Sequence, residues 1–280
     1  MRATEVAPTG SVARGVGWSL LAALFAAAFL VPYRYSVELA PRGTAMTAMF
    51  VVAVVFNGAV AFAQVGHRML RFDRVAGVLA IALAAFTIAG NLGIGGALPD
   101  IGAGMTSVVL KAQVILTPAL AVFLLSERAP SRLWVGGCVA LLGVAAPQWL
   151  AAEPRGTVGY AWALLGATAF ALMQIVTRRV IDRIQPAAVN ALRLVLAVIV
   201  LHGWPEGRAA WSASWTLWAA AGLAGILGPG VSRLCLMAAL HHVSPSLTAL
   251  IALIGTVFAF LFGFFFFGET PSGLELAGAT

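Results

Sequence analysis

Long apolar runs separated by short polar turns constrain this chain more than any other feature of its sequence. Each run is about 20 residues long, which is the length a helix needs to cross the hydrocarbon core of a bilayer. Only 10% of the residues are charged, whereas an ordinary soluble domain has roughly 25%. The runs also lack the alternation that is typical of barrel strands. We therefore predict an all-α polytopic membrane protein.

The apolar runs define nine expected spans, followed by the turn and first residues of a tenth at Glu269 to Thr280. The nine spans lie near 15–36, 43–65, 75–97, 102–125, 131–150, 158–178, 186–204, 213–239 and 244–267. We expect a ten-helix fold whose last helix is incomplete in this chain.

Lysine and arginine are distributed unevenly between the two ends of these spans. One set of loops contains ten of them (Arg2, Arg14, Arg68, Arg71, Arg74, Arg128, Arg132, Arg178, Arg179 and Arg183). The other set contains four (Arg34, Arg42, Arg155 and Arg208). Since short cytoplasmic loops are enriched in positive charge, we predict a cytoplasmic N-terminus. The basic residues form no block, so the net charge of +7 does not indicate a nucleic-acid partner.

The chain also repeats itself. Gly17 and Gly159 open the first and sixth spans, 142 residues apart, and Glu127 and Glu269 follow the fourth and ninth spans at the same offset. A repeat of five spans is odd in number, so the second copy must enter the membrane upside down. Inverted repeats of this kind are typical of secondary transporters. We divide the chain into a cytoplasmic tail, a first repeat and a second repeat with an incomplete last helix, at 1–14, 15–150 and 151–280.

The same offset relates two segments rich in glycine. Residues 89–96 of the third span correspond to the neighbourhood of 228–233 in the eighth, and Asn91 corresponds to Arg233. Paired interruptions of two spans indicate a transporter binding site, because freed backbone groups are tolerated only in protein or around a cavity. The alternative is close helix packing through small residues. The sequence leaves both open.

Several short motifs, in order and in duplicate, resemble those of the EamA domain of the drug/metabolite transporter (DMT) superfamily. They are Pro118, Glu127-Arg128, Pro130-Ser131 and Gly136-Gly137, then Gly268-Glu269, Pro271-Ser272 and Gly278, with Gln185-Pro186 and Arg193-Leu194 between them. The resemblance implies two inverted five-helix EamA-like repeats, a central cavity, and transport of small organic molecules across the bacterial inner membrane.

Within that superfamily, residues 109–113 are similar to the Gln-x-Gln stretch of a subgroup that exports cysteine-pathway metabolites and related amino acids. Lys111 replaces the first glutamine of that stretch. A lysine in the comparable helix also resembles the nucleotide-sugar branch, whose substrates are phosphorylated.

Lys111 is the only lysine and lies in the middle of the fourth span. A lysine at bilayer depth costs about 2.5–3.5 kcal/mol on insertion scales and usually marks a pathway or ligand. Ser107 shares its helical stripe, whereas Gln113 lies about 160° round an ideal helix. We therefore expect Lys111 to face the centre and Gln113 to bond to a neighbouring helix, since both cannot face one narrow cavity. The alternative role of Lys111 is to tie two helices together.

Other polar residues inside spans complete the candidates. Arg233 could bind an anionic group or extend towards the surface, and Asn91 and Gln174 could bind substrate or join helices. Arg193 is expected to be structural. The predicted substrate-binding residues are Lys111, Arg233, Gln113, Asn91, Gln174 and Ser107.

All ten acidic residues fall in predicted loops or at span ends. A proton-coupled exporter usually needs a titrating group inside the membrane, so we predict facilitated transport or exchange. We find no nucleophile with its base and no metal-ligand cluster, which predicts neither an enzyme nor a cofactor.

The sequence thus predicts a multi-pass inner-membrane exporter of small polar metabolites, anionic ones included, such as amino acids. Its expected partners are that small-molecule substrate and the lipid bilayer. The alternatives are multidrug efflux of lipophilic cations and a scaffold that transports nothing. The oligomeric state stays open.

Overall fold

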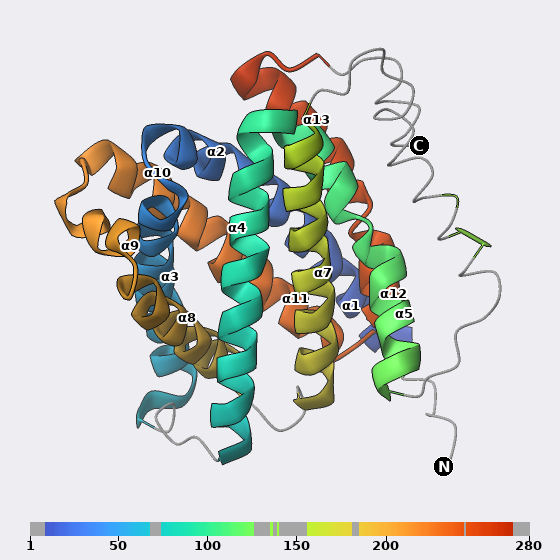
Figure 1. Cartoon of the computed structure of the whole chain (residues 1–280). Coiled ribbons are helices and arrows are strands. Elements are labelled where there is room, and N and C mark those ends of the chain that lie inside the picture. The colour runs from blue at the N-terminus through green and yellow to red at the C-terminus, as the bar shows by residue number, and fades with distance from the viewer. Residues whose placement is uncertain are drawn as a thin grey trace.

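The computed structural model describes residues 9–67, 74–125, 135–136, 139, 156–180, 185–243 and 245–270. Over these residues the chain is helical and has no strand. Figure 1 shows the helices running side by side, most of them roughly along one common direction. Six segments within the described residues are long and apolar enough to cross a membrane, or seven if the bent pair formed by residues 186–202 and 205–212 counts as one span.

The helices follow the predicted spans. In chain order they are α1 (Thr9–Ala28), α2 (Leu30–Leu39), α3 (Arg42–Val65), α4 (Arg74–Leu110), α5 (Gln113–Leu125), α7 (Thr157–Val180), α8 (Pro186–His202), α9 (Pro205–Ala209), η3 (Ala210–Ser212), α10 (Trp215–Gly225), the π-helix η4 (Ile226–Ser232), α11 (Arg233–Leu240), α12 (Pro245–Ile251) and α13 (Ile254–Phe267). They cover eight of the nine predicted spans. The fifth, at 131–150, lies outside the described residues except for 135–136 and 139, and so does the chain after residue 270.

Two backbone breaks shape the third and fourth spans. α4 consists of two helical segments that meet at Gly102, which has φ 71° and ψ 175°. Only glycine adopts this region without strain, and Figure 1 shows the chain turning back at the upper end of α4. The second break separates α4 from α5 at Lys111 and Ala112, whose amides bond three residues back, to Val108 (2.9 Å) and Val109 (3.0 Å). Such tight turns replace the α-helical pattern there.

The ninth span has a similar break. α12 ends at Ile251 and α13 begins at Ile254, and the amide of Leu253 bonds three residues back to Leu250 (3.1 Å). The broken parts of the fourth and ninth spans lie close together, because a Cβ placed on Gly255 would be 3.2 Å from Lys111 Nζ.

Of the two interpretations left open for the glycine-rich segments, close helix packing applies to the third span, which is not interrupted. Residues 89–96 remain α-helical, and their glycines serve the close packing of α4 against α7. A Cβ on Gly93 would lie 2.6 Å from the backbone nitrogen of Gly166, and one on Gly96 would collide with Trp162. Glycine alone costs a helix only about 1 kcal/mol, so close packing with α7 can keep this segment helical.

The predicted interruption of the eighth span is present. Ile226–Ser232 forms the π-helix η4, with Pro229 inside it. Proline has no backbone N–H and clashes with the carbonyl four residues before it, so the regular ladder cannot continue through this position. A proline, and not glycine alone, therefore distinguishes the broken segment from the unbroken one.

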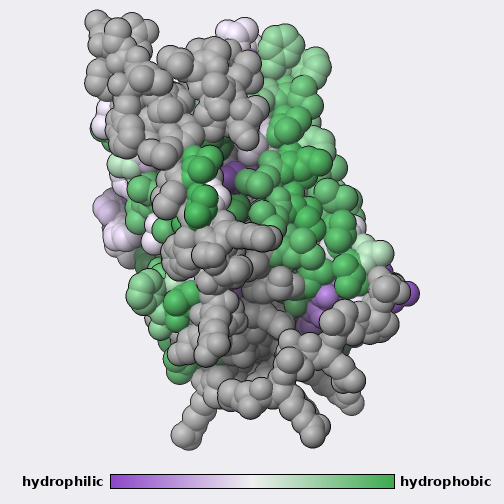
Figure 2. Space-filling model, turned by 90° about the vertical axis from the view of Figure 1, so that its right-hand side faces the viewer, coloured by the Kyte–Doolittle hydropathy of each residue, from purple (hydrophilic) through white to green (hydrophobic). Residues whose placement is uncertain are grey.

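The outer surface is apolar. Figure 2 shows a broad hydrophobic face on the side that α13 helps to form. Large side chains exposed on this helix include Phe264, Phe265 and Phe266, which are 51%, 73% and 66% exposed. Apolar surface of this extent is typical of a membrane-facing protein.

We expect Gly93→Ala to destabilise the protein, because its new Cβ would meet the backbone of α7, which cannot move aside cheaply. Overpacking of this kind costs about 1–3 kcal/mol, and the measurement is the melting temperature in detergent. The control is Gly58→Ala on α3, where a Cβ meets nothing within 4 Å. That change should be neutral or stabilise by about 0.4–1 kcal/mol. Equal effects at both positions would contradict the proposed packing of α4 on α7.

Candidate functional site

A cavity of about 190 Å³ lies between the helices of the two halves of the chain. α1, the two segments of α4, α5, α7, α8, η4, α11 and α12 all contribute side chains to its wall. The wall contains every predicted substrate-binding residue, namely Lys111, Arg233, Gln113, Asn91, Gln174 and Ser107. Predicted site residues up to 142 positions apart in the sequence, Asn91 and Arg233, are thus brought to one space.

Lys111 lies at the break between α4 and α5 and is half-buried. Within the described part of the chain its ammonium group makes neither a hydrogen bond nor an ion pair. Gly255 of α13 lies beside Nζ, and a side chain there would take the space that the ammonium occupies. Among the described residues, Lys111 therefore forms no bond that would tie two helices together.

Gln113 and Gln174 join α5 to α7. Gln174 Nε2 donates to Gln113 Oε1 (3.2 Å), and Gln113 Nε2 donates to the carbonyl of Leu110 (3.0 Å). The predicted bond from Gln113 to a neighbouring helix is confirmed. Our expectation that Lys111 and Gln113 cannot share a cavity is wrong, because the break at Lys111 rotates one side chain relative to the other. Gln174 Oε1 is buried and has no partner.

Two buried arginines also face the cavity, and neither pairs with a carboxylate among the described residues. Arg233, at the start of α11, donates from Nη2 to Thr177 Oγ1 (2.8 Å), and its Nε has no partner. It is only 7% exposed, so it does not extend to the surface. Arg193 donates from Nε to Asn190 Oδ1 (2.6 Å) and from Nη1 to Thr87 Oγ1.

Sequence reasoning missed the place of Arg193 in this wall and two buried asparagines behind it. Asn190 Nδ2 donates to Asn57 Oδ1 (2.6 Å) and to the carbonyl of Pro229 (2.8 Å). These side chains satisfy a backbone oxygen of the η4 break, and the same Asn190 orients Arg193. One sequence signal could have identified Asn57, Asn190 and Arg193, because each is a polar or charged residue inside an apolar span.

The remaining polar groups of the wall are neutral. Asn91 Nδ2 donates to the carbonyl of Thr87 (2.8 Å), which leaves its side-chain oxygen as an acceptor. The hydroxyls of Ser19 and Ser232 donate to the carbonyls of Gly15 (2.7 Å) and Ala22 (2.9 Å). Ser107, buried on the second segment of α4, makes no hydrogen bond within the described residues.

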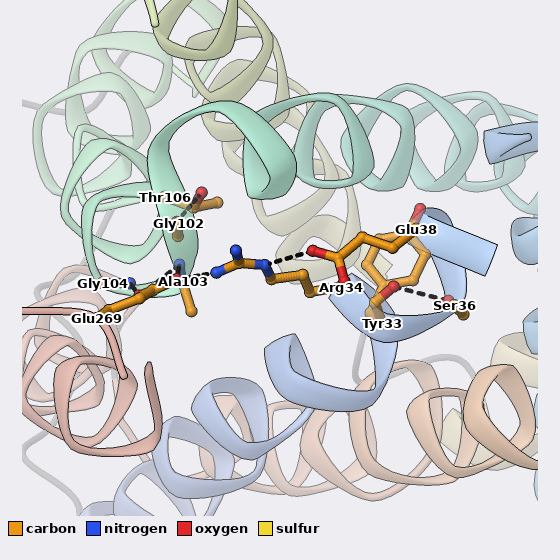
Figure 3. A network of polar contacts seen from close by, with 9 residues as sticks. All are labelled: Tyr33, Arg34, Ser36, Glu38, Gly102, Ala103, Gly104, Thr106 and Glu269. Carbon is orange, nitrogen blue, oxygen red and sulfur yellow. Dashed lines mark hydrogen bonds and ion pairs between the residues drawn. The ribbon is translucent and has the colours of Figure 1, made fainter. Parts of the chain in front are cut away.

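An ionic network closes the end of the bundle at which α2, the kink of α4 and the end of α13 meet (Figure 3). Glu269, just after α13, accepts from the amides of Ala103 (3.1 and 3.2 Å) and Gly104 (3.5 Å) at the start of the second segment of α4. It also forms an ion pair with Arg34 of α2, which in turn pairs with Glu38 (2.8 Å). One carboxylate therefore links the first, fourth and ninth spans.

Helices of membrane-spanning length define the class of multi-pass membrane proteins, and here they enclose a cavity with polar side chains in its wall. The model of the EamA-like transporter family matches residues 13–146 and 157–280, nearly the whole chain. The chain therefore belongs to the EamA-like transporter family, within the drug/metabolite transporter superfamily, whose members are membrane transporters of small molecules.

Comparison with solved structures gives 28 matching chains. One of them, a crystal structure of a protein, has a TM-score of 0.67 and 18% sequence identity, and the match covers 97% of this chain and 93% of that one. At this identity the likeness shows the fold alone. A search of curated proteins finds no match.

Glu269→Gln should lower the melting temperature in detergent, because the ion pair with Arg34 and the charge at the start of a helical segment are lost together. We expect a cost of about 1–3 kcal/mol. Glu38→Gln is the matched control: its side chain is 43% exposed and pairs with Arg34 alone, so its loss should cost less than about 1 kcal/mol. Equal losses would mean that Glu269 does not hold the three spans together.

Proposed function

We propose that this protein is a secondary transporter of small polar metabolites with an anionic group, a class that includes amino acids. The observation that carries the proposal is the cavity in which Lys111, whose ammonium is unpaired among the described residues, meets the five other polar candidates. A charge without a partner at bilayer depth is costly, and a ligand that supplies the missing anion offsets that cost. The six residues are the proposed substrate contacts.

The pairing of helices supports two inverted repeats, at 15–150 and 151–280, behind a short tail at 1–14. If the second repeat is an inverted copy of the first, each contact between helices should occur twice. The contact of α4 with α7 should then correspond to that of α11 with α1. The contact of α4 with α8 should correspond to that of α10 with α3. All four pairs are in contact. α3 and α8 occupy equivalent places in the two repeats, so their contact corresponds to itself, and this pair is in contact too. The breaks at 111–112 and 252–253 fall at nearly the same place in each repeat.

Contacts between turns support the assignment of the turns to two common sides, and the excess of arginine in one set supports a cytoplasmic N-terminus in the bacterial inner membrane. Turns assigned to the cytoplasmic side meet each other, as in the bond from Gln185 to Gln64 (2.6 Å). Turns assigned to the outside also meet, as in the bond from Gly43 to Glu206 (3.1 Å). In this orientation the Glu269 network lies at the outer end, and alternating access requires its contacts to part when the cavity opens outwards.

Export of metabolites fits the cavity better than the two alternatives. Lipophilic cations would be repelled by Lys111, Arg193 and Arg233, and no acidic residue in the described wall attracts them. A scaffold does not require an unpaired lysine in a cavity.

Lys111→Met and Arg193→Met form a matched pair that separates a ligand-binding cation from a structural one. Lys111→Met removes no hydrogen bond within the described residues, so the melting temperature should stay the same or rise. Flux should fall about ten- to a hundredfold, which corresponds to the loss of one charge-assisted contact. Arg193→Met removes the donor that Asn190 Oδ1 and Thr87 Oγ1 accept from, so we expect a loss of about 1–3 kcal/mol of stability.

Flux is measured as release from proteoliposomes that are loaded with a defined mixture of amino acids, hydroxy acids and quaternary amines. Mass spectrometry identifies the solutes that leave, and protein-free liposomes give the background. Release of no solute by the wild-type protein would contradict a transport function. Normal flux with lost stability in Lys111→Met would assign the lysine a structural role.

Transport should not depend strictly on a proton gradient, because the described wall of the cavity holds no aspartate, glutamate or histidine. The test compares release from the same liposomes with and without an imposed pH difference. We expect release to continue when the pH is equal on both sides. Release that stops without the gradient would refute facilitated transport or exchange.

A further inference from the structure

We propose that the cavity selects small organic anions that carry a hydroxyl group over amino acids of the same carbon skeleton. The inference rests on the proposed transport function and narrows its substrate class. It follows from the charges and the acceptors of the cavity wall, which treat a hydroxyl and an ammonium group differently.

The charged side chains of the described wall are all cationic. Lys111 has no partner within the described ranges, Arg233 bonds to the neutral hydroxyl of Thr177, and Arg193 bonds to neutral groups of Asn190 and Thr87. None of the three is compensated by a carboxylate among the described residues. In a site of low dielectric constant this excess attracts a negatively charged ligand group.

The acceptors of the wall are neutral. Gln174 Oε1 is buried without a partner, and the side-chain oxygen of Asn91 accepts no hydrogen bond from another described residue. Ser19 and Ser232 have given their hydroxyl hydrogens to backbone carbonyls, so they too can only accept. The wall thus offers acceptors for a ligand's O–H or N–H donor but no negative charge for an ammonium.

A hydroxyl and an ammonium group can both donate to these acceptors, yet only the ammonium brings a positive charge next to three others. A primary ammonium buried without a carboxylate also loses its hydration without compensation. A hydroxyl group avoids both costs. It still donates a hydrogen bond to a buried acceptor, which is unfavourable to leave without a partner. Selection against the α-ammonium group follows from the wall itself.

The ligand must also be small. The cavity of about 190 Å³ is below the roughly 300–1,000 Å³ of pockets that hold drug-sized molecules. Acids with three or four carbons are therefore suitable probes.

Two series of probes test the inference, each with one carbon skeleton and three substituents. The monocarboxylate series is lactate, alanine and propanoate, and the dicarboxylate series is malate, aspartate and succinate. Binding is measured as the rise in melting temperature of the purified protein, since a ligand of the folded state stabilises it. Transport is measured as release from proteoliposomes at neutral pH.

In at least one series we expect the hydroxy acid to bind most tightly, with the amino acid weaker by about tenfold or more. The unsubstituted acid should be about two- to tenfold weaker than the hydroxy acid, since it lacks one hydrogen bond. Lys111→Arg should keep this order and Lys111→Met should weaken binding of the whole series.

An amino acid that binds as tightly as its hydroxy acid in both series overturns the inference, and so does binding by none of the six probes. If the wild-type protein then still releases other solutes from the loaded liposomes, the transport function stands and only the selectivity is wrong. Release of no solute at all refutes the transport function itself.

Discussion

A polar group buried in apolar surroundings needs a partner, and around the cavity of this protein several of these partners belong to a different helix. The carbonyl of Pro229 in η4 is bound by Asn190 of α8, and Asn190 also orients Arg193, whose guanidinium reaches Thr87 of α4. Within a membrane, a polar backbone group that is left without a hydrogen bond costs several kcal/mol. These contacts therefore hold the helices around the cavity in one arrangement. The ammonium of Lys111 differs from these groups, because it has no partner among the described residues.

Local breaks in the helices create the space that these polar groups surround. Pro229 forces the wide turn of η4, and the chain resumes as α11 with Arg233 at the cavity. Gly102 turns the chain back so that both segments of α4 lie along α7, and Gly255 leaves room for the lysine. Since a proline or a glycine at one position changes the direction of a whole helix, few residues decide the shape of the site.

The candidate site was largely predictable because polar residues are costly inside apolar spans and therefore conspicuous. That argument found Lys111 and Arg233 but passed over Asn57 and Asn190, whose bond runs between helices far apart in the sequence. It also treated glycine as equivalent to proline, and so did not choose between a break and close packing at 89–96, where α4 is regular. An ideal helical wheel separated Lys111 from Gln113, although the break between them lets both face the cavity.

By itself the sequence determined that this chain is helical, that its helices lie in a membrane and that it resembles the EamA-like transporters. These properties depend on hydropathy over about 20 residues and on short motifs, both of which are local. Only the tertiary structure decided which polar side chains are satisfied and which remain open, such as Gln174 Oε1 and Arg233 Nε. That outcome depends on partners brought together from distant parts of the chain, and no local pattern specifies them.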